Sequence, residues 1–258
     1  MNDNIFLFSV DVESDFTDKN RDLTENVIKI LEIFDIFSVR ATFFIVAEIW
    51  KEKKGLLQEI SKKHEIACHS MTHPDSKKEF DENIIREALQ SKHILEDIVQ
   101  NEIKGFRSPF LNSHHNDEKL MSFLYDCGFK YHSSCLKSIF LRKEYNIFDF
   151  NNEKFVEFYS DRLLILPFPL SSLYLRIFYP FNFLKRASNI IIHPHDYLSG
   201  IPTVSKWLTH PCGWWTSPLR FLFERNVDKG FILLKNYIGS LNKTFLSYND
   251  VVDLLFKK

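Results

Sequence analysis

Two histidines stand four residues apart in the stretch HEIACHSMTH, residues 64–73. His69 and His73 follow a short apolar run, and residues i and i+4 of a helical turn share one face, so the two imidazoles can approach each other. Two imidazoles and one carboxylate form a catalytic zinc set that leaves a fourth coordination position for water. The spacing therefore indicates a metal site, although it also fits two polar residues at the end of a strand.

A pair of carboxylates follows the first apolar run of the chain, residues 5–10. In an extended chain, residues two apart point to the same side, which places Asp11 and Glu13 together and opposite Val10 and Val12. One carboxylate can then ligate a metal while the other accepts a proton. The alternative interpretation of this pair is a solvated acidic turn.

Two further polar residues end apolar runs later in the chain. Arg107 lies in GFRSPF, where its guanidinium can hold a carboxylate in a fixed orientation; the alternative is a surface arginine before a proline turn. His193 ends the run of NIIIHPHDY. Its charge changes near neutral pH, so it can serve as a general acid, or else be a core histidine with satisfied hydrogen bonds.

The hydrophobic periodicity predicts alternating strands and helices that would position these residues. Strands are predicted at 5–10, 41–47, 65–68, 103–106, 162–169, 189–193 and 244–248, and helices at 22–36, 52–63, 78–100, 116–127, 220–240 and 249–257. Such alternation favours an α/β fold with a parallel sheet, open or closed into a barrel, in a single domain spanning 1–258. The candidate residues all follow predicted strands, and functional groups gather at the C-terminal ends of parallel strands.

Composition narrows the class of protein. The 258 residues are 45% hydrophobic with a formal net charge of −1, so no general attraction to nucleic acid is expected. No glycine-rich nucleotide-binding motif occurs, and the four cysteines are too widely spaced to indicate a disulfide framework. The N-terminus lacks a basic region, and no apolar run approaches the ~18 residues of a spanning helix, so a cytoplasmic location is predicted.

Taken together, the motifs resemble those of the polysaccharide deacetylase family, carbohydrate esterase family 4. The matching stretches are FSVDVES, ATFF, HEIACHSMTHPD, GFRSPF, CGFKYHSSCL and NIIIHPHDY. The resemblance implies a distorted (β/α)7-type barrel and metal-dependent hydrolysis of an N-acyl group, acetyl or formyl, on an amino sugar. It implies Asp11 as general base, His69 and His73 as metal ligands, Arg107 as the group orienting the base, the backbone N–H near Phe110 as an oxyanion donor, and His193 as general acid.

The chain departs from the family pattern at two positions. Val12 stands where many members have a second aspartate, and valine cannot ligate a metal. The strand argument makes Glu13 the replacement ligand, with Asp11 next in line. His132 stands where the fourth motif often has an aspartate, so either His132 or Asp196 would be the partner of His193.

The expected cofactor is a divalent metal, zinc first, with cobalt, nickel or iron compatible with the same ligands. The expected substrate is a cytoplasmic precursor of a surface polysaccharide, lipid-linked or nucleotide-linked. Aromatic stretches at 171–183 and 207–223, with Trp214 and Trp215, would form a sugar-stacking platform or a lip contacting a membrane; they would otherwise fill the core. Two other functions stay open: a catalytically silent relative that binds saccharide or a partner protein, and a cyclic-amide hydrolase of the allantoin type.

Overall fold

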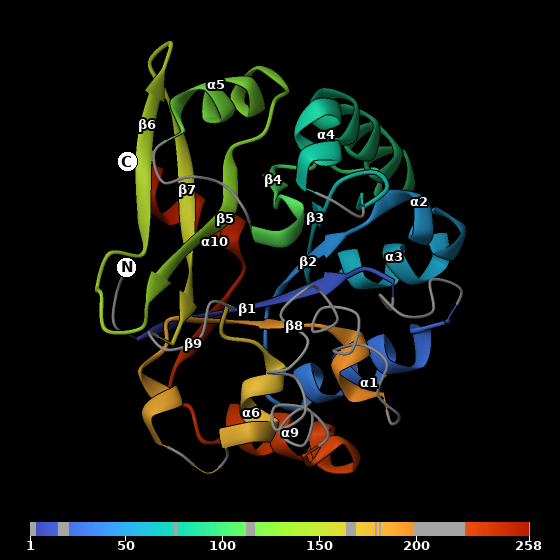
Figure 1. Ribbon diagram of the computed structural model, residues 1–258, viewed down its shortest axis with the longest axis vertical. Helices are drawn as coiled ribbons and strands as arrows, with labels where there is room; N and C mark the ends of the chain where they lie inside the picture. Colours follow the sequence, from blue (N-terminus) through green and yellow to red (C-terminus); the bar gives the residue numbers. More distant parts are fainter. Residues whose placement is uncertain are drawn as a thin grey trace.

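The computed structural model describes residues 4–14, 21–74, 77–111, 117–163, 169–178, 180, 182–198 and 225–257, without the side chains of 77–82, 85 and 110. Within these residues, one sheet joins the strands in the order β6-β7-β5-β4-β3-β2-β1-β8, and β9 pairs with β1 (Figure 1). Neighbouring strands are parallel except β6 and β7, which form an antiparallel hairpin. The predicted α/β fold with a mainly parallel sheet is confirmed.

The elements have the following bounds. The strands are β1 (Ile5–Val12), β2 (Thr42–Ile45), β3 (Glu65–Cys68), β4 (Gly105–Phe106), β5 (Tyr131–Ser138), β6 (Tyr145–Phe150), β7 (Glu153–Arg162), β8 (Asn189–Ile192) and β9 (Thr244–Leu246). The α-helices are α1 (Thr24–Ile36), α2 (Ala47–Trp50), α3 (Lys54–Ser61), α4 (Lys77–Val99), α5 (Glu118–Asp126), α6 (Ser172–Phe178), α9 (Gly230–Gly239) and α10 (Tyr248–Phe256). Short 3-10 turns are η1 (Lys51–Lys53), η2 (Pro109–Leu111), η3 (Asn182–Arg186), η4 (Pro194–Tyr197) and η5 (Val227–Lys229). No helix in the described part of the chain combines the length and hydropathy needed to cross a membrane.

Residues 169–171 connect β7 with the edge strand β8. Arg162 of β7 bridges to Pro169, and Ser171 bridges to Ile191 of β8. Between them, the Leu170 N–H donates to the Asp161 carbonyl at 2.6 Å, and the Leu170 carbonyl accepts from the Ile191 N–H at 2.9 Å. This short segment brings β7 beside β8, as a distorted barrel requires, although β7 and β8 do not pair directly as neighbouring strands.

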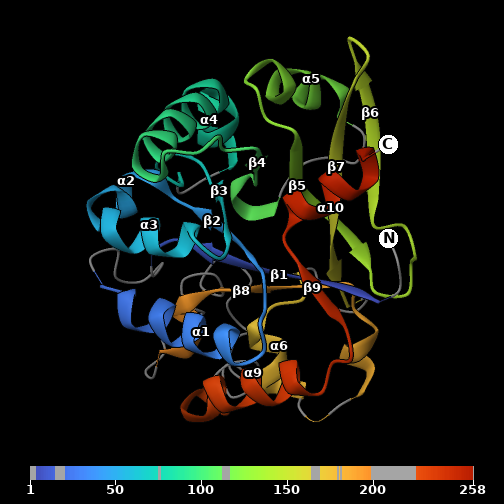
Figure 2. The ribbon, with the colours of Figure 1, turned by 180° about the vertical axis from the view of Figure 1, so that it is seen from behind.

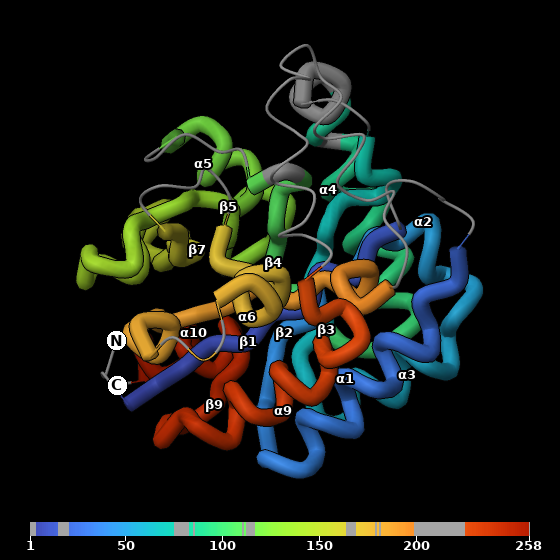
Figure 3. Tube along the Cα trace, turned by 60° about the horizontal axis from the view of Figure 1, so that its bottom comes forward, coloured from blue at the N-terminus to red at the C-terminus, as the bar shows by residue number. Residues whose placement is uncertain are grey.

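The side chains of β1 alternate between two cores, as expected for a strand covered on both faces. Phe6, Phe8, Val10 and Val12 belong to the large outer cluster, which also includes buried residues of α1 and α3. Figures 1 and 3 show α1, α3 and α4 along the outside of the strands, with α6 packed on α9. The odd residues point the other way, so Asp11 and Glu13 share the inner side opposite Val10 and Val12, as predicted.

Helix α10 covers the inner core from behind in the view of Figure 1 and lies in front of β5 and β7 in Figure 2. The inner apolar cluster combines residues of β1, β2, β3, β5, β7 and α10: Leu7, Phe44, Ala67, Tyr131, Val156, Phe158, Tyr248, Val251 and Val252. Tyr248 stacks on Tyr131 at 5.8 Å between ring centroids and meets Phe158 edge-on at 4.8 Å. The aromatic layer forms an apolar floor beneath the polar residues Ser9, Asp11 and Glu13.

The sequence-based prediction misses strands between residues 131 and 162. The strand predicted at 162–169 falls mostly on residues 164–168, which lie outside the described residues, and the described strand β7 runs from Glu153 to Arg162. Strands β5 and β6 were not predicted. The hairpin turn consists of Asn151 and Asn152, whose φ angles of 52° and 65° match the type I′ turns that asparagine tolerates. The Asn-Asn pair could therefore have indicated a hairpin, but the polar, half-exposed sequence of β6 does not look like a strand.

Candidate active site

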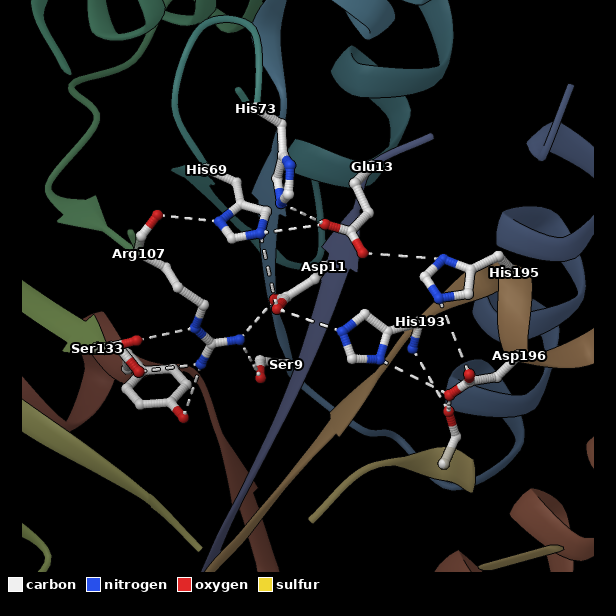
Figure 4. Close-up of polar contacts among 12 residues, drawn as sticks. Ser9, Asp11, Glu13, His69, His73, Arg107, Ser133, His193, His195 and Asp196 are labelled. Atoms are coloured by element: carbon white, nitrogen blue, oxygen red, sulfur yellow. Dashed lines mark hydrogen bonds and ion pairs between the residues drawn. The ribbon is translucent and has the colours of Figure 1, made fainter. Parts of the chain in front are cut away.

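The predicted residues converge at the C-terminal ends of their strands (Figure 4). Asp11 and Glu13 come from the end of β1, His69 and His73 from the loop after β3, Arg107 from the residue after β4, and His193 from the residue after β8. Phe110 lies in η2, shortly after Arg107. Trp214 and Trp215 lie outside the described residues.

Arg107 fixes Asp11. Its Nη1 donates to Asp11 Oδ1 at 2.5 Å and to Ser9 Oγ at 2.9 Å. Its Nε and Nη2 donate to the carbonyl and hydroxyl of Ser133 at 3.0 and 2.9 Å, and Nη2 also reaches Tyr248 Oη at 3.3 Å. Because the guanidinium is fully buried and held on several sides, one oxygen of Asp11 is anchored and the other points into the site.

Glu13, His69 and His73 bring three possible ligand atoms together. Glu13 Oε2 lies 2.9 Å from His73 Nε2 and 3.4 Å from His69 Nε2. His69 Nδ1 lies 2.9 Å from the Arg107 carbonyl oxygen, which only accepts hydrogen bonds, so Nδ1 is the donor there and Nε2 is the nitrogen that faces Glu13. The three ligand atoms lie within 4.8 Å of one another. These residues fit a divalent cation.

The electrostatics of this set match such a role. Burial alone would raise the pKa of Glu13, but the charge of His73 and hydrogen bonds from both histidines hold that pKa well below its usual range. Burial would lower the pKa of His73, whereas Glu13 raises it above its usual value. The site thus attracts positive charge to the imidazole of His73, and a bound cation would take the place of that proton.

His193 faces Asp11 on one side and Asp196 on the other. Its Nε2 lies 3.7 Å from Asp11 Oδ2, and its Nδ1 lies 3.7 Å from Asp196 Oδ2, which also accepts a 2.6 Å hydrogen bond from Ser172 Oγ. Burial opposes protonation, but Asp196, Glu13 and Asp11 together raise the pKa of His193 to about 9. This raised pKa favours the protonated form of His193, and Asp196 is the carboxylate that faces its Nδ1.

His132, the other candidate partner, lies on the opposite face of the sheet. Its ring stacks on Phe106 of the outer cluster at 6.0 Å, and its Nε2 is hydrogen-bonded to Ser108 Oγ at 3.0 Å. Burial, and then the charge of Arg107, lower the pKa of His132 to about 3. It is a neutral core histidine.

His132 predicts an acid-sensitive fold. In the unfolded chain this imidazole has a pKa of about 6.5 and binds a proton as the pH falls from 7 to 5, whereas in the folded chain it stays neutral. The free energy of unfolding should therefore fall by about 2 kcal/mol over this range because of His132. His132→Gln keeps a hydrogen-bonding group without titrating. Urea unfolding of the metal-free proteins at both pH values should show a smaller loss for the variant, and equal losses would contradict the assignment.

Several residues of the site were not predicted. Ser9 precedes Asp11 by two positions on the same face, a signal that the strand argument already contained. His195 Nδ1 lies 3.8 Å from Glu13 Oε1, and its Nε2 lies 3.9 Å from Asp196 Oδ1. The second histidine of HPHD was therefore a readable signal. Tyr248 comes from α10, more than a hundred residues from Arg107, and no pattern in the sequence connects the two.

The sequence profile of the polysaccharide deacetylase family matches residues 12–132, which include Glu13, His69, His73 and Arg107. This part of the chain is thus similar to the polysaccharide deacetylase family. The resemblance inferred from the motifs is thereby confirmed. A search of curated proteins gave no match.

Solved structures of this deacetylase family share the fold. A candidate polysaccharide deacetylase from Mycobacterium smegmatis superposes with a TM-score of 0.62 at 15% identity, covering 97% of this chain and 89% of its own. A family 4 acetyl xylan esterase from Clostridium thermocellum, solved with a cobalt ion, gives 0.52 at 11% identity, with coverage of 97% and 91%. A family 4 pseudoenzyme from Bacillus anthracis gives 0.53 at 12% identity, with coverage of 98% and 67%. The predicted distorted barrel is confirmed.

Proposed function

We propose that this chain is a metal-dependent hydrolase that removes an N-acyl group, acetyl or formyl, from an amino sugar. One observation carries the proposal: Asp11 Oδ2 lies 3.9 Å from His69 Nε2 and 3.7 Å from His193 Nε2. The Asp11 carboxylate thus lies between the ligand set and the imidazole of His193. In this position it can take a proton from a water molecule that attacks a substrate carbonyl, while the imidazole donates a proton to the leaving nitrogen.

The residues divide the work as follows. A divalent cation held by Glu13, His69 and His73 would polarise the amide carbonyl and acidify a water molecule. Asp11, oriented by Arg107, accepts the water proton as the oxygen attacks the carbonyl carbon. The backbone N–H near Phe110 donates to the oxyanion that develops.

His193 completes the reaction by protonating the leaving nitrogen as the C–N bond breaks. An amine leaves poorly without that proton, and a histidine with a raised pKa holds it ready at neutral pH. Asp196 orients the ring and stabilises its positive charge, as the third member of a hydrogen-bonded catalytic group does.

Zinc is the proposed metal, because two imidazoles and one carboxylate suit it. Cobalt, nickel and iron accept the same ligands, and the acetyl xylan esterase from C. thermocellum was solved with cobalt. For the substrate we propose an amino-sugar precursor of a surface polysaccharide in the cytoplasm, carried on a lipid or a nucleotide, with Trp214 and Trp215 stacking on the sugar. Contact with a membrane would suit a lipid carrier, and the exposed Phe140 and Leu141 beside Arg142 and Lys143 fit an anionic surface.

The first test is metal content. We expect near-stoichiometric metal in the reconstituted wild type and a clear loss in Glu13→Gln, measured by elemental analysis and followed by a screen for acetate or formate release from amino sugars. Glu65→Gln is the matched control. Glu65 is also a carboxylate with hydrogen-bond partners, Thr42 and Tyr131, but it lies at the N-terminal end of β3, whereas His69 follows the C-terminal end. Metal retained in Glu13→Gln would make Asp11 the third ligand.

Val12 supports a second candidate function, that of a catalytically silent relative. The B. anthracis relative is a pseudoenzyme, and this chain lacks the second aspartate of the first motif. A wild type without metal after reconstitution would favour a silent relative that binds saccharide or a partner protein. That outcome would direct attention to binding assays on the same face of the barrel.

A further inference from the structure

The loop that carries the two histidines has an unfavourable backbone. Ser70 and His73 have φ angles of 70° and 52°, in the left-handed region. For residues other than glycine this conformation costs about 1–2 kcal/mol each. Something in the surrounding structure must hold residues 69–73 in this shape.

Glu87, in the middle of α4, supplies a large part of that hold. Its Oε2 accepts hydrogen bonds from the backbone N–H groups of Met71 and Thr72 at 2.9 and 2.8 Å. Its Oε1 accepts from Thr72 Oγ1 at 3.0 Å. The side chain is fully buried, with Arg86 Nη2 3.5 Å from Oε1. Hydrogen bonds to a buried carboxylate are strong ones, so this residue fixes the middle of the loop.

Weaker contacts fix the rest of the loop. The hydroxyl of Ser70 accepts from the His73 N–H at 3.0 Å, and the carbonyls of Ser70 and Met71 accept from the N–H groups of Ala47 and Glu48 at 3.2 and 2.9 Å. These bonds tie the loop to α2. Glu87 ties the same loop to α4, so contacts with two helices clamp the loop.

The clamp determines where His73 points. With the loop in this shape, His73 Nε2 lies 2.9 Å from Glu13 Oε2, and the two imidazoles meet edge-on at 5.2 Å between centroids. If the middle of the loop relaxed toward ordinary φ angles, His73 would leave this position, whereas His69 would stay, anchored by β3 and by the Arg107 carbonyl.

We propose that Glu87 is a positioning residue of the metal site, which holds His73 in ligating geometry through the backbone of Met71 and Thr72. The inference rests on the proposed function, because it concerns the same ligand set. Glu87 is not a member of the ligand set, and its side chain meets the loop at Met71 and Thr72. Its effect should therefore appear in metal affinity and coordination geometry before it appears in the fold.

The test compares Glu87→Gln with Glu65→Gln. Glutamine keeps the volume of glutamate but is neutral and has one acceptor oxygen instead of two, so its hydrogen bonds to the loop lose their charge assistance. Chelator-treated wild type and both variants are titrated with Co²⁺, with the visible absorption bands reporting coordination and urea unfolding reporting stability. We expect Glu87→Gln to bind Co²⁺ about 10–100-fold more weakly with altered bands, as loss of an outer-shell partner does, and Glu65→Gln to match the wild type.

Each other outcome overturns the inference. Wild-type affinity and bands in Glu87→Gln would reduce Glu87 to a structural role, whatever the unfolding curves show. Equal loss of affinity in both variants would mean a general effect of losing a buried carboxylate. A wild type that binds no Co²⁺ would refute the proposed metal site itself, and the wild-type titration separates that failure from the other two.

Discussion

Asp11→Asn should lower the rate of N-acyl release about 10³-fold, within the 10²–10⁴ range that a positioned general base contributes. Asparagine has nearly the same shape, and its amide oxygen can still accept the hydrogen bond that Arg107 Nη1 gives to Asp11 Oδ1. What it loses is the ability to accept the proton of the attacking water. The measurement is kcat on the N-acyl amino sugar that the screen identifies.

Metal content separates the two roles open to Asp11. A general base can be lost without loss of metal, so Asp11→Asn should retain near-stoichiometric metal while Glu13→Gln does not. Loss of metal in Asp11→Asn as well would make Asp11 a ligand, consistent with its 3.9 Å distance from His69 Nε2. A kcat within tenfold of the wild type, with metal bound, would contradict the base assignment.

Arg107→Met should be the most destabilising single change in the site, by about 3–5 kcal/mol, because it leaves the Asp11 carboxylate buried without its partner. Methionine fills much of the same volume against the ring of Phe44, which lies 3.9 Å from the guanidinium carbon. The cost therefore reflects an unpaired charge more than a cavity. Urea unfolding at pH 7 measures it.

Two companion variants identify the cause. Adding Asp11→Asn to Arg107→Met removes the unpaired charge and should restore part of the lost stability, a positive coupling in the double-mutant cycle. Arg40→Met breaks the ion pair with Asp250, whose partners are 45% and 24% exposed, and should cost only about 0–1 kcal/mol. Similar losses for Arg40→Met and Arg107→Met would contradict the explanation.

The site was largely predictable because its residues follow apolar runs. Asp11, His69, Arg107 and His193 each come directly after such a run, and a parallel sheet brings the C-terminal ends of its strands to one edge. The side shared by Asp11 and Glu13 followed from strand periodicity alone. These predictions needed only local pattern and one rule about sheets.

The failures concern contacts between distant segments. The choice between Asp196 and His132 depended on which face of β5 points inward, and β5 was itself missed because YHSSCLKS has no apolar alternation. The clamp by Glu87 joins α4 to the loop after β3, and one charged residue in an amphipathic helix looks like any other. Pairings across the barrel leave no periodic trace in a single sequence.

The aromatic floor gives the site an order of assembly. Tyr248 begins α10, yet it packs under Phe44 and Tyr131 and reaches the guanidinium that fixes Asp11. This tyrosine lies more than two hundred residues after β1 in the sequence. The Asp11 carboxylate at the end of β1 is therefore anchored completely only when α10 has packed against the inner core and Tyr248 has reached Arg107.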